Sequence, residues 1–265
     1  MELKKSLFLE IFLFLYKKKF FSVKEFYEFF KVKKSNFYYF YIKIFQEIGI
    51  KVFQINKKEY FLSYYANFLN REKILSELDG KITILTITNS TNQYIIDNIE
   101  KYKNGDVCIA EYQTNGRGKM GKRWVSPIGK NLNFSIYWKL DRNKKQIYGL
   151  DTAISIKIAK ILKSIGFKDI SVKWPNDLFF KNEKVAGILV EIYNRRKIFH
   201  VIIGIGINIQ KIPKFIAKSI NQEWSYLQKF GMSVDRDALL IKIIKEVRET
   251  ILEFQKYGFD PYFYN

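Results

Sequence analysis

The chain is 265 residues long, and its 48% hydrophobic and 27% charged residues are typical of a globular protein with one large domain or two. The net charge of +20 favours affinity for polyanions, but the basic residues are spread along the chain, so charge alone decides no function. The single cysteine, Cys108, excludes an internal disulfide and fits a reducing compartment, and the single histidine, His200, argues against a Ser-His-Asp centre or a histidine-rich metal site.

The first sixteen residues resemble part of a signal peptide but lack some of its features. Lys4 and Lys5 precede an apolar run, but Glu10 interrupts this run and three lysines at 17–19 close it. A membrane span needs about 20 apolar residues, and no cleavage pattern of small residues follows. We therefore expect an amphipathic helix and a cytoplasmic protein.

Residues 1–65 carry the pattern of a winged helix-turn-helix domain. After a first helix over 6–16, Ser22 and Glu25 form a capping box for a second helix, and Ser35 can cap a third. Three short helices followed by a β-hairpin are typical of this fold. The two strands of the hairpin are predicted at Ile50–Ile55 and Glu59–Ser63.

If this domain binds DNA, the third helix enters the major groove and the hairpin wing contacts phosphates. An asparagine on that helix can read adenine, but arginine, the commonest reader of guanine, does not occur before Arg71. A packing module that reads no operator is an equal alternative. The residues predicted to contact DNA are Asn36, Tyr39, Lys43, Lys57 and Lys58.

A linker helix is predicted over 66–80, and a second domain over 81–265. Apolar stripes at three- and four-residue steps indicate helices after Ser90, over 151–164 and after Asp235. Further strands of this domain are predicted at 82–88, 107–112, 132–140, 170–174 and 184–193.

The run IFHVIIGIGINI at 198–209 is apolar at both alternating sets of positions. A strand of this kind is buried on both faces, so we predict a central strand of the sheet. Gly204 and Gly206 within it indicate close approach of a ligand or of another backbone.

The stretch NGRGKMGKRWVSPIGKNLN at 115–133 is a glycine-rich, basic loop between two predicted strands. Glycines 116, 118 and 121 permit positive φ angles and close approach to a ligand. The loop is not a phosphate-binding P-loop, and its G-x-G-x-x-G spacing is followed by a strand instead of the helix that a dinucleotide site needs. It is either a solvated connection or a lid over a phosphate or carboxylate. Its cations are Arg117, Lys119, Lys122 and Arg123.

Polar residues at 89–93 occupy a predicted junction between a strand and a helix. Ser90 and Gln93 fit a capping box, and capping alone would account for them. Alternatively, the hydroxyl and amide groups of this segment hydrogen-bond a polar small molecule.

Five sequence blocks together resemble the biotin protein ligases. With the winged helix in front, the chain resembles the bifunctional kind, which ligates biotin and represses biotin synthesis. Lipoate ligases share the catalytic fold, but the glycine-rich block together with KWPND favours biotin. The resemblance implies an α+β fold of the biotin–lipoate ligase type, similar to class II synthetases, with a mixed central β-sheet and flanking helices. The blocks are NSTN at 89–92, GRGKMGKRWVSPIGKNL at 116–132, KWPND at 173–177, KVAGILVE at 184–191 and GIGINI at 204–209.

The resemblance implies a reaction in two steps. Biotin and ATP, with Mg²⁺, give biotinyl-5′-AMP, and a lysine of the biotin carboxyl carrier protein then attacks this mixed anhydride. Both nucleophiles belong to substrates, so preorganised cations and backbone N–H groups suffice. Operator DNA and a second copy of the chain, in a homodimer of the adenylate-bound form, are further implied partners.

The resemblance also implies roles for single residues. Arg117 would hold the carboxylate of biotin and later the phosphate, Lys184 would contact a reacting oxygen, and Lys173 lies beside the reacting centre. Asp177 would orient Mg²⁺ or the incoming lysine, or else serve only in a turn. Trp224 would cover adenine at the end of a lid over 210–224. The implied biotin site is Ser90, Thr91, Asn92, Gln113, Gly116, Arg117, Gly118, Lys119, Lys184 and Gly187, and the implied nucleotide site is Arg117, Lys119, Arg123, Trp124, Asn176, Asn208 and Trp224.

Two features depart from the family pattern. Lys119 stands where bifunctional relatives usually carry arginine, and lysine lacks the planar fork, so we expect looser retention of the adenylate. The chain also stops at 261–265, where a small C-terminal β-barrel would begin. A biotin-sensing DNA-binding regulator with weak or no ligase activity is therefore the alternative function.

Overall fold

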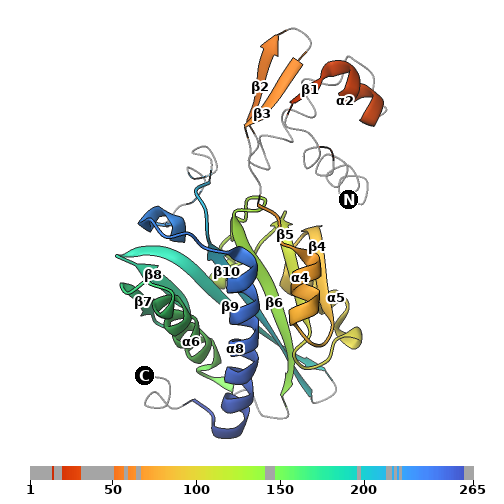
Figure 1. Cartoon of the computed structure of the whole chain (residues 1–265). Coiled ribbons are helices and arrows are strands. Elements are labelled where there is room, and N and C mark those ends of the chain that lie inside the picture. The colour runs from red at the N-terminus through yellow and green to blue at the C-terminus, as the bar shows by residue number, and fades with distance from the viewer. Residues whose placement is uncertain are drawn as a thin grey trace.

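The computed structural model describes residues 14, 20–30, 51–56, 59–63, 67–140, 147–195, 198–212, 217, 220 and 223–259. Figure 1 shows the arrangement of its elements. Among the helices in these ranges, none combines the length and the apolar character that crossing a membrane requires.

The N-terminal part contains a three-stranded antiparallel sheet and a short helix, α2 (Val23–Phe30). The predicted capping box is confirmed: the Ser22 backbone N–H donates to the Glu25 carboxylate (2.8 Å), and the Glu25 N–H donates to the Ser22 hydroxyl (3.2 Å). The predicted hairpin is also found, but a third strand pairs with it that the sequence did not predict. In sheet order the strands are β1 (Phe20–Ser22), β3 (Glu59–Ser63) and β2 (Lys51–Asn56).

The predicted third helix of this domain falls outside the ranges that the structure describes. The same holds for the residues predicted to contact DNA, which are Asn36, Tyr39, Lys43, Lys57 and Lys58.

The helix observed in the predicted linker is shorter than expected. It is α4 (Arg71–Glu77), with the side chain of Asn70 accepting the Lys73 N–H as the N-cap, whereas residues 67–70 are not helical. Its Ile74 is fully buried in the main core. Burial of Ile74 ties this segment to the second domain.

Strands between residues 82 and 208 form a seven-stranded mixed sheet, and the resemblance implied a mixed sheet. The first two strands of the sheet are parallel, and every other neighbouring pair is antiparallel. The predicted central strand is confirmed, since β10 pairs with β6 on one side and β9 on the other. In sheet order the strands are β4 (Ile82–Thr88), β5 (Val107–Gln113), β6 (Asn131–Leu140), β10 (Ile198–Asn208), β9 (Glu183–Arg195), β8 (Asp177–Phe180) and β7 (Ile170–Lys173).

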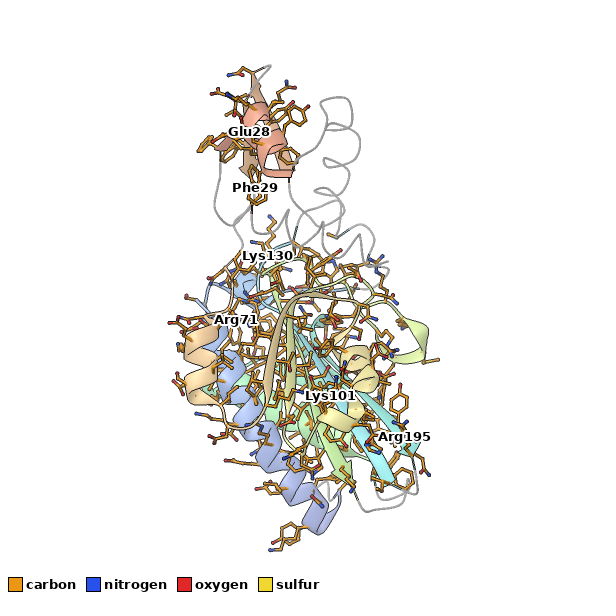
Figure 2. The ribbon with its side chains drawn as sticks, turned by 90° about the vertical axis from the view of Figure 1, so that its right-hand side faces the viewer. Glu28, Phe29, Arg71, Lys101, Lys130 and Arg195 are labelled. Atoms are coloured by element: carbon orange, nitrogen blue, oxygen red, sulfur yellow. The ribbon has the colours of Figure 1, made fainter. Side chains whose placement is uncertain are left out.

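Helices cover both faces of this sheet (Figures 1 and 2). On one face, α6 (Leu150–Ser164) and α8 (Arg236–Tyr257) pack with α4 over the large core cluster. On the other face, α5 (Thr91–Asp97) packs over a smaller cluster. Figure 2 shows α4 beside α8, and α5 on the other side of the strands. Short 3₁₀ turns occur at Ile99–Lys101, Lys119–Gly121 and Leu227–Phe230.

Alternation along the strands makes the two faces chemically different. On β6, Leu132 and Phe134 belong to the large core, while Asn133 and Ser135 point to the α5 face. The register of the sheet sets Gly204 of β10 opposite Ser135. The α5 face therefore has small and polar residues at its centre, where a ligand can be held.

Candidate functional site

A cavity opens on the α5 face of the sheet, and the glycine-rich loop lies at its edge. Its lining contains twelve residues that the sequence predicted for the site. These are Ser90, Thr91, Asn92, Gln113, Arg117, Gly118, Lys119, Trp124, Asn176, Asp177, Lys184 and Gly187. The lining also includes Ile188, Leu189, Gly204, Ile205 and Gly206.

The glycine-rich loop folds back on itself as a small hairpin. The Trp124 N–H donates to the Gly116 carbonyl (2.8 Å), and the Gly118 N–H donates to the Lys122 carbonyl (2.7 Å). The expectation of positive φ holds for Gly121 alone among the three predicted glycines, and Met120 also adopts it (φ 54°). Gly116 is needed for a different reason, because a Cβ there would lie 2.4 Å from the Trp124 carbonyl oxygen.

The glycines of β10 allow side chains, not another backbone, to approach the sheet. A Cβ on Gly204 would lie 2.5 Å from Oδ1 of Asn92, and a Cβ on Gly206 would lie 2.4 Å from the indole of Trp124. Both contacts are shorter than real side chains tolerate. The sequence predicted the approach of a ligand or of another backbone at these glycines, whereas the structure places two side chains of the cavity wall there.

Three ion pairs place cations around the cavity. Arg117 Nη2 lies 2.8 Å from Glu191 Oε2, and Lys184 Nζ lies 2.8 Å from Asp177 Oδ2. The third pair joins Lys119 Nζ to Asp151 Oδ2 at 2.6 Å. Each cation is therefore neutralised by a carboxylate but keeps further N–H donors for an anionic ligand; Nε of Arg117, for example, is buried and has no hydrogen-bond partner among the described residues.

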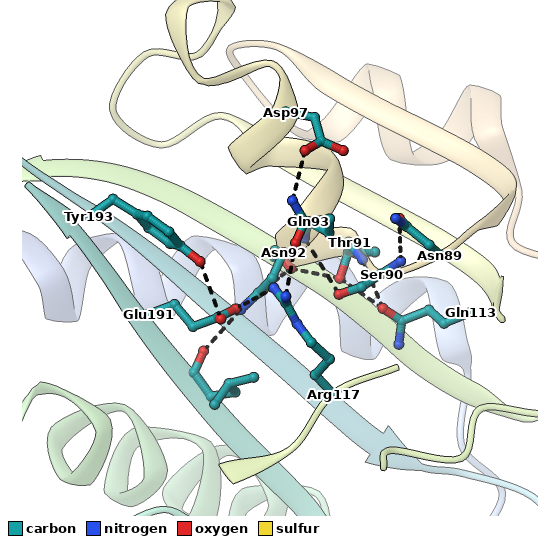
Figure 3. Close-up of polar contacts among 12 residues, drawn as sticks. Asn89, Ser90, Thr91, Asn92, Gln93, Asp97, Gln113, Arg117, Glu191 and Tyr193 are labelled. Carbon is teal, nitrogen blue, oxygen red and sulfur yellow. Dashed lines mark hydrogen bonds and ion pairs between the residues drawn. The ribbon is translucent and has the colours of Figure 1, made fainter. Parts of the chain in front are cut away.

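Arg117 is fixed by more than its carboxylate (Figure 3). Its Nη1 donates to Oε1 of Gln93 at 2.8 Å. Glu191 Oε2 accepts a second bond, from Asn92 Nδ2, at 2.7 Å. The capping box predicted for Ser90 and Gln93 is thus only half formed: Ser90 caps α5, but the side chain of Gln93 bonds Arg117 and Asp97.

Behind this layer lies a buried polar network that orients the first turn of α5. Ser135 is fully buried, and its hydroxyl contacts Oγ1 of Thr91 (2.6 Å) and Oδ1 of Asn92 (2.5 Å). Oε1 of Gln113 accepts the Thr91 N–H at 2.8 Å. Satisfied buried networks of this kind hold side chains in one orientation, which is what a site for a polar, uncharged ligand group requires.

The turn before β8 is fixed by Asn176. Its Nδ2 donates to the Ile188 carbonyl (2.8 Å), and the Ile188 N–H donates to the Asn176 carbonyl (2.9 Å). These bonds clamp the turn to β9 and set Asp177 opposite Gly187. The predicted turn is therefore present, with Asp177 directed at Lys184.

Five predicted residues do not line the cavity. Lys173 and Arg123 are exposed, and Nζ of Lys173 lies over the ring of Phe179. Gly116 is buried at the base of the loop. The last two, Asn208 and Trp224, lie near each other at one end of β10: Asn208 Nδ2 donates to the carbonyl of Ser225 (2.9 Å), and Trp224 bridges to Lys184 through the backbone.

The lone cysteine and histidine stay out of the site, as the composition indicated. Cys108 is fully buried among apolar residues, and this burial raises its thiol pKa to about 12. His200 is buried against Tyr137, and burial lowers its pKa. Neither residue lines the cavity.

Sequence reasoning missed three residues that hold the site together. Glu191 and Asp151 are the carboxylates paired with the loop cations, and Ser135 belongs to the buried polar network. The sequence predicted Gln93 as part of a capping box or of a polar binding segment, but not as a partner of Arg117. Ser135 could have been found, because the alternation of β6 places it on the same face as Asn133. No sequence signal identifies Asp151 as part of the site, because an acidic residue is common in the first turn of any helix.

Chemically, this arrangement suits a ligand with an anionic end and a polar, uncharged end. Cations that can exchange partners lie on one side, and buried amide and hydroxyl groups lie on the other. Within the described ranges, no three His, Cys, Asp or Glu residues gather as a metal site.

The sequence and the fold of this chain are similar to those of known protein ligases. The sequence profile of the biotin/lipoate A/B protein ligase family matches residues 84–208. The bifunctional ligase/repressor BirA of Escherichia coli is 38% identical over 224 residues, which are 84% of this chain and 70% of that protein, and the BirA of Salmonella typhimurium gives the same figures. A solved structure of biotin protein ligase from Aquifex aeolicus, in complex with biotin and ATP, superposes with a TM-score of 0.54 at 27% identity, covering 68% of this chain and 74% of that one.

Proposed function

This chain belongs to the biotin/lipoate A/B protein ligase family, and on that premise we propose that it is an ATP-dependent biotin protein ligase. The proposed substrates are biotin, ATP and a lysine of the biotin carboxyl carrier protein. The observation that carries the proposal is the cavity itself, in which loop cations face a buried polar network. The similar structure holding biotin and ATP supports the same substrates.

In the first step, an oxygen of the biotin carboxylate attacks the α-phosphorus of ATP, and pyrophosphate leaves. Arg117 and Lys184 hold the two anions together by exchanging their carboxylate partners for substrate oxygens. Thr91, Asn92 and Gln113 hydrogen-bond the uncharged head of biotin, while Asn208 and Trp224 receive the nucleotide. The enzyme contributes position and charge, so no enzyme nucleophile is needed.

In the second step, the amine of the acceptor lysine attacks the carbonyl carbon of biotinyl-5′-AMP. An amide bond forms, AMP leaves with the electrons of the carbon–oxygen bond, and the nitrogen releases one proton to solvent. Asp177 orients the incoming amine and Lys173 lies beside it on the exposed side. Lys119 retains the adenylate by its charge until the acceptor arrives.

The site offers few protein ligands for Mg²⁺. Asp177 offers one carboxylate, already shared with Lys184 and Asn176. One carboxylate together with phosphate oxygens is a common way for proteins to hold Mg²⁺. Mg²⁺ bound with ATP would neutralise phosphate charge, and Asp177 would be its protein ligand.

The test is a transfer assay with biotin, ATP and a purified carrier domain. Arg117→Ala should lower kcat/KM for biotin by at least about 100-fold, the loss expected when one preorganised charge is removed. Arg195→Ala is the matched control, because that arginine forms an exposed ion pair with Glu100 away from the cavity, and it should retain activity. Equal activity of the two variants would show that the site assignment is wrong.

A second proposed function is repression at an operator. The proposed domains are a winged helix-turn-helix over 1–65, a linker over 66–80 and the catalytic domain over 81–265. The three-stranded sheet with α2 fits part of such a winged domain, and the similar E. coli protein is named a ligase/repressor. Cytoplasmic location and dimerisation of the adenylate-bound form belong to the same proposal.

Two assays separate the proposed functions. An operator shift that requires both biotin and ATP supports repression, with Lys57→Ala weakening it. Biotin-dependent release of pyrophosphate separates a ligase from a biotin-sensing regulator without catalysis, because only the ligase turns ATP over.

A further inference from the structure

Asn131, at the start of β6, carries an amide that joins two oxygen acceptors. Its Nδ2 donates to the backbone carbonyl of Val125 (3.2 Å) and to Oδ1 of Asn208 (3.1 Å). Asn131 and Asn208 are cross-strand partners on β6 and β10. Asn131 itself is 1% exposed, whereas Val125 and Asn208 are half-buried. One buried nitrogen atom therefore holds together two oxygen atoms of less buried residues.

Backbone carbonyls at both ends of this chain of bonds determine which way each amide points. Val125 offers only a carbonyl oxygen there, so the nitrogen of the Asn131 amide has to face it. Nδ2 of Asn208 donates to the Ser225 carbonyl (2.9 Å), which leaves its Oδ1 for Asn131. Turning either amide over would set two oxygen atoms against each other. The Val125 carbonyl and Oδ1 of Asn208 each keep a lone pair for a further donor.

Stability alone does not account for an asparagine at position 131. Its own Oδ1 is buried and has no hydrogen-bond partner among the described residues. An unsatisfied buried oxygen costs free energy, so this side chain weakens the fold relative to a fully paired one. Departures of this kind from the pairing rule occur in proteins mainly at functional sites. The two acceptors that the amide holds are therefore the feature to explain.

At each end of this chain of bonds, the backbone carbonyl belongs to a residue that directly follows a tryptophan. Trp124 precedes Val125, lines the cavity and rests against Gly206. Trp224 precedes Ser225. Flat aromatic ligands stack on indole rings. The chemistry that suits this place is a flat heterocycle with an amino group, because the two N–H bonds of such a group can serve two oxygen acceptors.

We propose that Asn131 is a positioning residue that makes the site select a nucleotide with an amino group on its base over one with a carbonyl oxygen. This selection rests on the proposed function, which brings ATP to this end of β10. The 6-amino group of adenine can donate to the oxygens of Val125 and Asn208. Inosine triphosphate (ITP) carries a carbonyl oxygen at the same position, which the two acceptors would repel.

Biotin-dependent release of pyrophosphate, measured with ATP and with ITP, tests the selection. Wild type should prefer ATP by at least about 100-fold in kcat/KM. Asn131→Ala should reduce this preference to about tenfold or less, mainly through a higher KM for ATP, with the KM for biotin unchanged. Asn131→Ser, whose hydroxyl can donate to one oxygen only, should give an intermediate ratio. Each ratio compares two substrates in one preparation, so the fraction of folded protein cancels.

Asn104→Ala is the matched control. The amide of Asn104 also bonds β6, but through the backbone of Lys139 near the other end of the strand. This variant should keep the wild-type preference for ATP. A wild-type ratio in Asn131→Ala overturns the proposal.

Calorimetric binding of ATP and ITP in the absence of biotin separates the role of Asn131 from the ligase activity. Wild type should bind ATP at least about 100-fold more tightly than ITP. Equal affinities of wild type for the two nucleotides overturn the proposal, even when pyrophosphate is released. Selective binding of ATP without any release of pyrophosphate supports it and contradicts the ligase function. Absence of ATP binding contradicts both.

Discussion

The substitution Gly206→Ala tests whether a glycine of the central strand is required to seat Trp124. Gly206 has no positive φ, so alanine fits the backbone, and the cost comes only from the added methyl group. That methyl would lie 2.4 Å from two ring carbons of Trp124, whereas carbon atoms in contact normally lie about 3.5–4.0 Å apart. The indole must therefore retreat by more than about 1 Å.

The free-energy cost of moving the indole depends on the contacts that it makes. Nε1 of Trp124 donates to Oδ1 of Asn133 at 2.9 Å, and a shift of that size breaks the bond. Asn133 is 1% exposed, and its Nδ2 has no partner among the described residues, so its amide would be left unsatisfied. Overpacking of about 1–3 kcal/mol and the lost bond of about 1–3 kcal/mol are partly offset by about 0.5–1 kcal/mol from replacing a strand glycine. We expect a loss of about 3 kcal/mol, the middle of a range of about 1–5 kcal/mol.

Urea unfolding measures this loss, and Gly187→Ala is the matched control. Gly187 is the cross-strand neighbour of Gly206, but a methyl there would meet only the movable ends of Asp177 and Lys184 at 3.3–3.4 Å. Its cost should stay below about 1 kcal/mol. In a Trp124→Leu background, which removes the ring, Gly206→Ala should cost little. Equal costs with and without the ring, or equal costs for the two glycines, would show that contact with Trp124 is not the source of the cost.

Three further predictions concern stability. Asp235→Ala removes the N-cap of α8 and should cost about 1 kcal/mol at pH 7 in urea unfolding. Because the Ala238 N–H lowers the pKa of folded Asp235, this contribution is full above the unfolded pKa of about 4 and is lost as pH falls through the lower folded pKa, so the difference from wild type should shrink there. Burial lowers the pKa of His200, so the unfolded chain binds the proton more readily, and wild-type stability should fall as the pH drops below about 6.5, a fall that should be absent in His200→Gln. Arg236→Leu should cost about 3–5 kcal/mol in thermal or urea unfolding, because it strands buried Glu111, and adding Glu111→Leu should recover part of that loss.

Local sequence patterns predicted the helices and strands whose positions depend on neighbouring residues. The apolar run at 82–88 is β4 with the predicted bounds, and Asp235 caps α8 as its side chain indicated. The strand β1 could not be predicted in this way, because its three residues become a strand only by pairing with β3, about forty positions later. Likewise, α4 begins only at 71, where the side chain of Asn70 caps it.

The same distinction between local and long-range determinants applies to the site. The resemblance supplied most residues of the cavity, but not the carboxylates that neutralise its cations. Such pairs depend on which distant elements come together: Glu191 reaches Arg117 only because β9 lies in the floor beneath the loop. The sequence does not show which acidic residue pairs with a given basic residue. A loop rich in lysine and arginine therefore appears to carry more net positive charge in the sequence than it does in the fold.

This neutralisation decides where the affinity for an anionic substrate must come from. A ligand carboxylate can bind Arg117 by replacing the carboxylate of Glu191 or through Nε, which is buried and has no hydrogen-bond partner among the described residues. Because Glu191 already neutralises the guanidinium, the net electrostatic gain is small. A simple anion such as acetate should therefore bind poorly. Affinity has to come from the rest of the ligand, through the polar groups around Thr91, Asn92 and Gln113, which already point at the cavity and cost little to organise. The cations then act mainly when negative charge builds up at the reacting phosphate, which is where binding energy accelerates a reaction.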